Sequence, residues 1–324
     1  MLKDSCNREF PYLRLSITDI CNFSCQYCLP DGYKCKNKPD FLKIDELQRL
    51  VTAFSELGVW KIRITGGEPT VRKDFLEIAS MISNIDKIKD LAFTTNGYRL
   101  KENAQAWRDA GLSSINVSMD SMNPDTFHEI TGHNRFNDVL EGVRKSIEVG
   151  FERVKINAVL LKNVNDNEIG DYLNLLKDTP VTVRFIELMQ TGDNLEYFNK
   201  FHISVNDIKY DLIEKGWVQE IRACGAGPAV TLTHKDFKGK IGFIAPYDKD
   251  FCKGCNRLRT TSTGDLRLCL FGESGIPLRQ FLQSDQQKEE LKDLISGQLQ
   301  YKCSSHFLKD GNTGITPHLA SIGG

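Results

Sequence analysis

The chain has 324 residues, 40% of them hydrophobic and 26% charged, and 42 basic against 43 acidic residues give a net charge of −1. This balance argues against a nucleic-acid binder or a membrane-surface binder, because both need a basic face. The first ten residues carry four charges and no apolar run of 18 residues occurs, so we expect no signal peptide, no membrane span and a cytoplasmic location. The unusual feature is the ten cysteines, because a reducing compartment disfavours structural disulfides.

Short runs rich in Val, Ile and Thr predict strands at 12–18, 59–65, 91–95, 114–118, 153–160 and 181–187. Helical stretches alternate with them, and three of these end at a glycine, the residue expected just past a helix: 45–57 at Gly58, 102–110 at Gly111 and 137–149 at Gly150. The alternation predicts a parallel sheet with right-handed crossovers. Six units are two short of a full barrel, so the predicted fold class is α/β, an incomplete (β/α)6 TIM-type barrel, rather than a doubly wound sheet. Reactive groups belong at the C-terminal ends of such strands.

The pattern changes after residue 215. Glycines and prolines, a predicted hairpin around Lys238-Gly239 and helical stretches at 278–283 and 286–299 follow. We therefore predict a barrel domain over 1–215 and a C-terminal α+β extension over 216–324 that closes the barrel mouth. The stretch 310–324 has no apolar periodicity, which is typical of a mobile tail.

A first cysteine group, Cys21-Asn-Phe-Ser-Cys25-Gln-Tyr-Cys28, directly follows the first strand. Three thiols on one loop can converge on a soft metal centre. A four-iron cluster held by three thiolates leaves one iron able to bind a small molecule through an amine and a carboxylate. A zinc site completed by Cys35 or a distant histidine is the alternative.

A second group is formed by Cys252 and Cys255, and after a predicted hairpin through 263–265, by Cys269. These three thiols could also meet at one centre, and they have no obvious fourth partner. The residues alone leave open a zinc knuckle and an iron–sulfur cluster that serves only electron transfer.

Basic residues stand on four of the predicted strands: Arg14, Arg63, Lys155 and Arg184. Charges on buried parallel strands are rare without a partner, because desolvation costs several kcal/mol per ion. They predict either an enclosed anionic substrate or salt bridges to strand carboxylates such as Glu187.

The C-x3-C-x2-C spacing resembles the radical S-adenosylmethionine (SAM) superfamily, as does the glycine-rich turn Gly66-Gly67-Glu68-Pro69 after the second strand. The resemblance implies that the first group holds a [4Fe-4S] cluster, that SAM binds its open iron, and that one-electron cleavage gives a 5′-deoxyadenosyl radical. It also implies SAM contacts at Tyr27, Gly67, Ser118 and Met189. A strand-end turn residue and a core methionine are the other interpretations of Ser118 and Met189.

The whole pattern is similar to the GTP 3′,8-cyclase family of molybdenum cofactor biosynthesis. The second cysteine group continues as C-x2-C-x-R-x-R, and further motifs follow at family-like spacing: LRLS at 13–16, KIRITGGEP at 61–69, TTNG at 94–97, INVSMD at 115–120, RFIE at 184–187 and GG at 323–324. The resemblance implies a lyase that abstracts the ribose C3′ hydrogen of GTP and forms (8S)-3′,8-cyclo-7,8-dihydroguanosine 5′-triphosphate.

By this resemblance a second [4Fe-4S] cluster, held by Cys252, Cys255 and Cys269, binds the guanine of GTP. The residues implied in GTP binding are Arg14, Arg63, Thr94, Lys155, Arg257, Leu258 and Arg259. Catalytic support is implied for Arg184 and for Gly323 and Gly324, whose end of the chain enters the cavity. The implied partners are GTP, an external electron donor, the next pathway enzyme (cyclic pyranopterin monophosphate synthase) and a second copy of the chain.

Two other functions stay open at this point. One is a radical SAM enzyme that modifies a peptide and carries an auxiliary cluster, and it needs no set of cations. The other is a non-catalytic iron–sulfur or zinc protein.

Overall fold

The computed structural model describes residues 1–34, 40–223, 225–272, 275–314 and 320. All six predicted strands are present, with ends shifted by up to two residues: β1 (Tyr12–Ser16), β2 (Lys61–Thr65), β3 (Asp90–Thr95), β4 (Ser114–Ser118), β5 (Arg153–Leu160) and β6 (Thr182–Glu187). They pair side by side in chain order and all run parallel.

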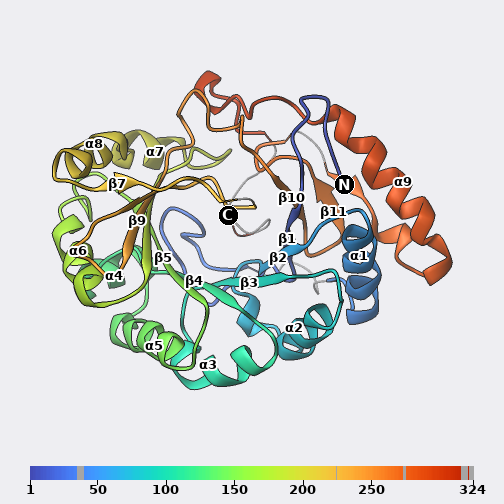
Figure 1. The fold of residues 1–324 in the computed structure, drawn as a ribbon, viewed down its shortest axis with the longest axis horizontal. Helices are drawn as coiled ribbons and strands as arrows, with labels where there is room; N and C mark the ends of the chain where they lie inside the picture. Colours follow the sequence, from blue (N-terminus) through green and yellow to red (C-terminus); the bar gives the residue numbers. More distant parts are fainter. Residues whose placement is uncertain (35–39, 224, 273–274, 315–319, 321–324) are drawn as a thin grey trace.

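The helices of the barrel half are α1 (Ile44–Glu56), α2 (Phe75–Ser83), α3 (Leu100–Asp109), α4 (Pro124–Thr131), α5 (Phe136–Glu148) and α6 (Ile169–Asp178). Figure 1 shows the helices around the outside of the curved sheet. The three predicted stops are confirmed, because Gly58, Gly111 and Gly150 follow α1, α3 and α5 with φ of 96°, 90° and 81°. Only glycine adopts this left-handed conformation freely.

The C-terminal part contains α7 (Leu195–Phe201), α8 (Asn206–Glu214), β7 (Val218–Gln219), β8 (Val230–Thr233), β9 (Lys240–Ile244), β10 (Arg257–Thr260), β11 (Asp265–Arg267), β12 (Ile276–Pro277) and α9 (Lys288–Gln298). Both predicted hairpins are confirmed as the antiparallel pairs β8–β9 and β10–β11. The predicted helix at 278–283 is wrong: Arg279–Phe281 forms a single 3₁₀ turn. So short a segment cannot offset the cost of helix nucleation.

Two strands of the C-terminal part extend the barrel sheet itself. β9 pairs parallel with β6, and β10 pairs parallel with β1, so the parallel strands run β10-β1-β2-β3-β4-β5-β6-β9. Within the described residues β9 and β10 do not pair, and the barrel stays open between them. The incomplete barrel is confirmed, but the C-terminal part adds a strand to each of its edges.

The main hydrophobic core is shared by both parts of the chain. Leu13 and Phe93 of the barrel belong to the same buried cluster as Leu258 of β10 and Ile295 of α9. The boundary at residue 215 stays a prediction.

None of the helices in the described part of the chain has the length and hydrophobicity of a membrane span.

The two cysteine groups lie at opposite ends of the barrel. Cys21–Cys28 follow the C-terminal end of β1, whereas Cys255 precedes the N-terminal end of β10, which runs parallel to β1. Cys269 follows β11, which is antiparallel to β10 and so returns to the same end as Cys255.

Candidate active site

The first cysteine group lies on a loop anchored by Phe23. This ring is buried and stacks on the ring of His133 with 4.6 Å between centroids. Burial raises the pKa of the Cys21 thiol to about 11 and that of Cys28 to about 12, and the charge of Cys21 adds to the rise at Cys28. For Cys25 burial again raises the pKa, followed by the charges of Asp120, Cys28 and Cys21. The three thiols are therefore close enough to interact.

This donor set fits a cluster with three thiolate ligands. Among the described residues, no three His, Cys, Asp or Glu side chains are arranged to hold one metal ion. Cys35, the fourth ligand of the zinc alternative, lies outside the described residues.

The glycine-rich turn after β2 packs directly on the start of the cysteine loop. The Gly67 N–H donates to the Thr18 carbonyl at 2.9 Å, and the Glu68 N–H donates to the Ile20 carbonyl at 2.8 Å. A Cβ at Gly66 would lie 2.2 Å from the Thr18 oxygen, and one at Gly67 would lie 2.5 Å from the Ile20 oxygen. The two glycines are therefore needed for contact with the protein's own backbone.

Replacing Gly66 with Ala is expected to destabilise the protein by roughly 2–3 kcal/mol, because its φ of 152° and the Thr18 oxygen both oppose a Cβ. Urea unfolding of the metal-free protein measures this. The matched control is Gly170→Ala on α6, where a Cβ meets nothing within 4 Å and the stability should not fall. Equal stability of the two variants would contradict the argument.

The residues implied in SAM binding lie at the C-terminal ends of strands. Gly67 follows β2, Ser118 ends β4 and Met189 comes just after β6. The Tyr27 hydroxyl donates to the Asp120 carboxylate at 3.0 Å, which ties the cysteine loop to the end of β4. The SAM contacts themselves stay predictions.

The second cysteine group lines a cavity of about 720 Å³ inside the barrel. Burial raises the pKa of Cys252, and the charges of Cys269 and Cys255 raise it further. Burial would also raise the pKa of Cys255, but the cations Lys302 and Arg257 lower it below its usual value. The three thiols therefore form a second interacting set, in a more positive environment.

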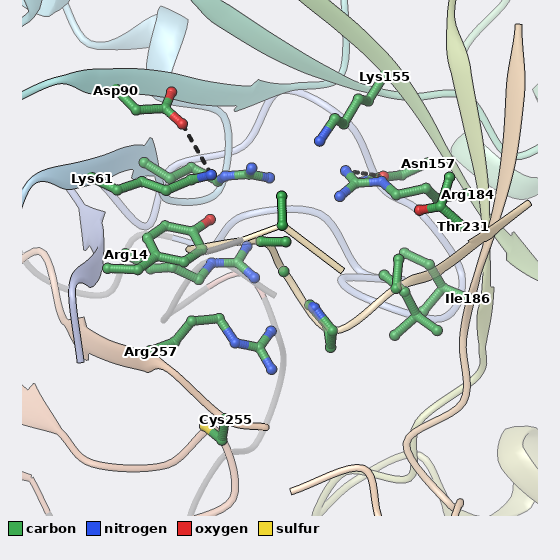
Figure 2. Close-up of a pocket in the computed structure, with 18 of the residues that line it drawn as sticks. Arg14, Lys61, Asp90, Lys155, Asn157, Arg184, Ile186, Thr231, Cys255 and Arg257 are labelled. Atoms are coloured by element: carbon green, nitrogen blue, oxygen red, sulfur yellow. Dashed lines mark hydrogen bonds and ion pairs between the residues drawn. The ribbon is translucent and has the colours of Figure 1, made fainter. Parts of the chain in front are cut away.

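The structure brings all the predicted strand cations to this cavity. Figure 2 shows Arg14, Lys155, Arg184 and Arg257 pointing into one space. The predicted site residues in the cavity wall are Arg14, Arg63, Lys155, Arg184, Met189, Cys252, Cys255, Arg257, Arg259 and Cys269. The described wall does not include the first cysteine group, Tyr27, Gly67, Thr94, Ser118 or Leu258.

Strand register explains how the arginines meet. Arg14 on β1 lies opposite Arg259 on β10 and Arg63 on β2, so the three form one row across adjacent strands. A second row, two residues earlier, contains Arg257 and Lys61 on either side of Tyr12. Side chains two residues apart on a strand point to the same face, so both rows face the cavity.

The cations repel one another in this buried space. Burial lowers the pKa of Lys155 to about 6, and the charges of Arg184 and Arg63 add to the fall. Burial and Arg63 lower the pKa of Arg184 to about 9, and burial and Arg257 lower that of Arg259 to about 10. A polyanion in the cavity would relieve this repulsion.

The salt-bridge alternative gains no support at Glu187. Its carboxylate accepts the Val205 N–H at 3.1 Å, and Arg184 donates to the Asn157 side-chain oxygen at 2.5 Å. Asp90 pairs with Lys61 at 3.0 Å and with Arg153 at 2.7 Å, so this strand carboxylate does form salt bridges.

Three polar residues of the barrel interior were missed from the sequence. Both side-chain polar atoms of Asn116 are buried without a hydrogen-bond partner among the described residues, as is the Thr94 hydroxyl in register beside it. Asn157 holds Arg184, and Lys61 lines the cavity. A polar residue in the middle of a buried strand is the signal that could have found Asn116 and Asn157.

The C-terminal tail is described only in part. The sequence predicts mobility here, yet Ala320 is buried and its N–H donates to the Cys28 thiol. Ala320 therefore lies beside the first cysteine group. Gly323 and Gly324 lie outside the described residues, as does Cys224.

Comparison with known families agrees with this geometry. Residues 15–176 match the radical SAM superfamily, and residues 181–308 match the family described as Molybdenum Cofactor Synthesis C. The crystal structure of Streptococcus suis SuiB shares the fold, with a TM-score of 0.60 at 14% identity over 89% of this chain and 68% of that chain.

Curated relatives are similar over their whole length. A GTP 3′,8-cyclase of Vibrio atlanticus is 53% identical over 324 residues, covering 99% of this chain and 97% of that protein. One of Psychromonas ingrahamii is 55% identical over 323 residues, covering 100% of this chain and 95% of that protein. The chain therefore belongs to the radical SAM superfamily and, within it, to the GTP 3′,8-cyclase family.

Proposed function

We propose that the protein converts GTP into (8S)-3′,8-cyclo-7,8-dihydroguanosine 5′-triphosphate in molybdenum cofactor biosynthesis. The reaction removes the ribose C3′ hydrogen and forms a bond from C3′ to guanine C8. The observation that carries the proposal is the cavity, which joins two rows of cations to the second cysteine group. Its volume of about 720 Å³ is in the range of small-molecule sites.

The cations match a nucleoside triphosphate in charge. A triphosphate carries about four negative charges, and enclosing it requires cations that can donate hydrogen bonds. Arg63 and Arg184 each keep a buried Nε–H without a partner among the described residues. Asn157 holds Arg184 in place, so this guanidinium is oriented before the substrate binds.

The two cysteine groups have different roles at the two ends of the barrel. When a [4Fe-4S] cluster is bound there, Cys21, Cys25 and Cys28 place the electron source that SAM cleavage needs at one end. Cys252, Cys255 and Cys269 would hold a second cluster beside the cation rows, where the guanine binds. A radical reaction between the two groups requires that the barrel interior exclude water, because this limits side reactions.

GTP binding is expected to take up a proton through Lys155. Its pKa of about 6 leaves it mostly neutral above pH 7, and bound phosphates should raise that pKa. Only the protonated form attracts phosphate, so affinity should fall as the pH rises from 7.5 to 8.5, by up to about tenfold. Calorimetry in buffers of different ionisation enthalpy counts the protons taken up.

The control for this prediction is Lys155→Arg, which keeps a cation at every pH. Its GTP affinity should vary less with pH, and Lys155→Met should bind weakly at every pH. The γ-phosphate is ionised throughout this range, so it contributes little to the proton count. No net proton uptake by the wild type would count against the assignment of Lys155.

Product analysis tests the proposed function directly. The reconstituted and reduced protein is incubated with SAM and each nucleoside triphosphate in turn, and the products are identified by mass spectrometry. Only GTP should give a cyclic product together with 5′-deoxyadenosine. A peptide-modifying enzyme would leave GTP unchanged, and a protein with tightly bound zinc and no iron would be non-catalytic.

The proposal includes partners and a location as well. The enzyme receives its electrons from an external donor and passes its product to cyclic pyranopterin monophosphate synthase. It works in the cytoplasm as a homodimer. Light scattering of the reconstituted protein measures its oligomeric state. A monomer at working concentration would contradict the proposed homodimer.

A further inference from the structure

Basic side chains from three distant segments hold the backbone of the second cysteine group. Arg8 donates to the Cys252 carbonyl at 3.0 Å, and Arg222 donates to the Gly254 carbonyl at 2.8 Å. Lys302 donates to the carbonyl of Leu268, the residue before Cys269. Each segment that carries a cysteine of this group is therefore held by a basic side chain. None of these three basic residues is among the predicted GTP-binding residues.

Arg8 uses its whole guanidinium fork in this arrangement. Besides Cys252, it donates to the carbonyls of Ser304 at 2.9 Å and Cys303 at 2.7 Å, and its Nε donates to Asp4 at 2.7 Å. The side chains of Arg8 and Asp4 are 8% and 0% exposed. The fork thus joins the N-terminal segment, the second cysteine loop and the segment after α9, a geometry that lysine cannot reproduce.

Lys302 is the second buried cation that holds the backbone of the second cysteine group. It is 5% exposed, and its ammonium group lies 5.2 Å from the centroid of the fully buried Phe10 ring. Its side chain also forms part of the cavity wall. The N-terminal segment therefore contributes to both cations, through Asp4 at Arg8 and through Phe10 at Lys302.

A cation placed here has two physical effects on a bound cluster. Hydrogen bonds to the loop carbonyls fix the directions from which the thiols approach, as outer-shell contacts do at metal sites. A positive charge beside an anionic cluster favours its reduced form and so raises its reduction potential. Arg8 has the geometry for the first effect, and Lys302 has the burial for the second.

We propose that Arg8 and Lys302 are positioning residues for the second cluster: Arg8 fixes the loop of Cys252, and Lys302 sets the cluster's reduction potential. This inference rests on the proposed function, which places a cluster at Cys252, Cys255 and Cys269. It assigns a role to the N-terminal segment, which carries none of the motifs of the active site.

The first experiment compares Arg8→Gln and Arg8→Lys with the wild type, all reconstituted as full-length protein. The wild type should hold about eight irons per chain, and both variants about four. The remaining cluster should still change its electron paramagnetic resonance spectrum when SAM is added, whereas the response to GTP should be lost. Glu9→Gln is the matched control, because the Glu9 side chain is on the same segment and forms an exposed ion pair with Lys3.

The second experiment measures reduction potentials without SAM or GTP, so that substrate contacts play no part. Lys302→Met keeps the apolar stem beside Phe10 and should keep about eight irons, but its second cluster should have a lower potential. Lys302→Arg should restore the potential. The first cluster in the same molecule is the internal reference and should not move.

Several outcomes would overturn the inference. One is an Arg8→Gln protein that keeps eight irons and responds to GTP like the wild type. Another is the loss of both clusters together, which would show a general folding defect. If the reduction potential of the second cluster is unchanged in Lys302→Met, Lys302 does not set that potential. Cys255→Ala separates this failure from that of the proposed function: about four irons in that variant would confirm a cluster held by Cys255, whereas about eight irons would mean that the second cluster is not held by this group.

Discussion

Replacing Cys25 with Ala is expected to abolish the formation of 5′-deoxyadenosine from SAM. Cys25 is the central thiol of the first group, and the charges of Cys28 and Cys21 help to raise its pKa, which places the three thiols near one another. A cluster that leaves one iron open for SAM needs all three thiolates, so the loss of any one removes the electron source. Chromatography of quenched, dithionite-reduced reactions measures the product.

Two cysteine variants serve as controls for this result. Cys6→Ala changes an exposed thiol outside both groups and should leave SAM cleavage unchanged. Cys255→Ala changes the second group and should stop GTP cyclisation while some uncoupled SAM cleavage continues. Cleavage at the wild-type rate in Cys25→Ala would contradict the assignment of the first group.

Replacing Arg63 with Met is expected to raise the KM for GTP by roughly 30- to 1000-fold, or about 2–4 kcal/mol. Arg63 is 8% exposed, stands in the central arginine row beside Arg14, and keeps a buried Nε–H without a partner among the described residues. Phosphate bound there gains a desolvated, charge-assisted hydrogen bond that methionine cannot provide. Steady-state kinetics with GTP varied at saturating SAM measures the change.

The KM for SAM is the internal control, because three of the predicted SAM contacts, Tyr27, Gly67 and Ser118, lie outside the described wall of the cavity that contains Arg63. Arg144→Met, a change of an exposed arginine on α5, controls for the loss of one positive charge and should leave both constants unchanged. Equal increases in the KM for GTP and SAM would point to a disturbed barrel and would count against a specific phosphate contact.

Local patterns were enough to predict the barrel half of the fold, and the prediction of two cysteine ligand groups rests on local patterns as well. Strand runs, helix stops at Gly58, Gly111 and Gly150, and the spacing of each cysteine group all depend on residues close together in the chain. The basic residues of the barrel could also be recognised from single strands, because a charge on a buried strand needs a partner wherever that strand pairs. The structure places these residues around one cavity.

Other parts of the site depend on pairings between distant segments, and no local pattern encodes these. The parallel placement of β10 beside β1 brings Arg259 next to Arg14, although 245 positions separate the two residues in the chain. Just beyond the ends of these strands, Ser262 donates to Asp19 at 2.6 Å. Arg8 likewise reaches Cys252 across the whole barrel sequence.

The cysteine groups, the glycine turns and the strand cations can thus be read from the printed chain, because each follows from the chemistry of neighbouring residues. The two added strands, the rows of arginines and the cations behind the second cysteine group come from tertiary packing. Burial of one shared core fixes which strands pair and in what register, and that register decides which side chains face the cavity.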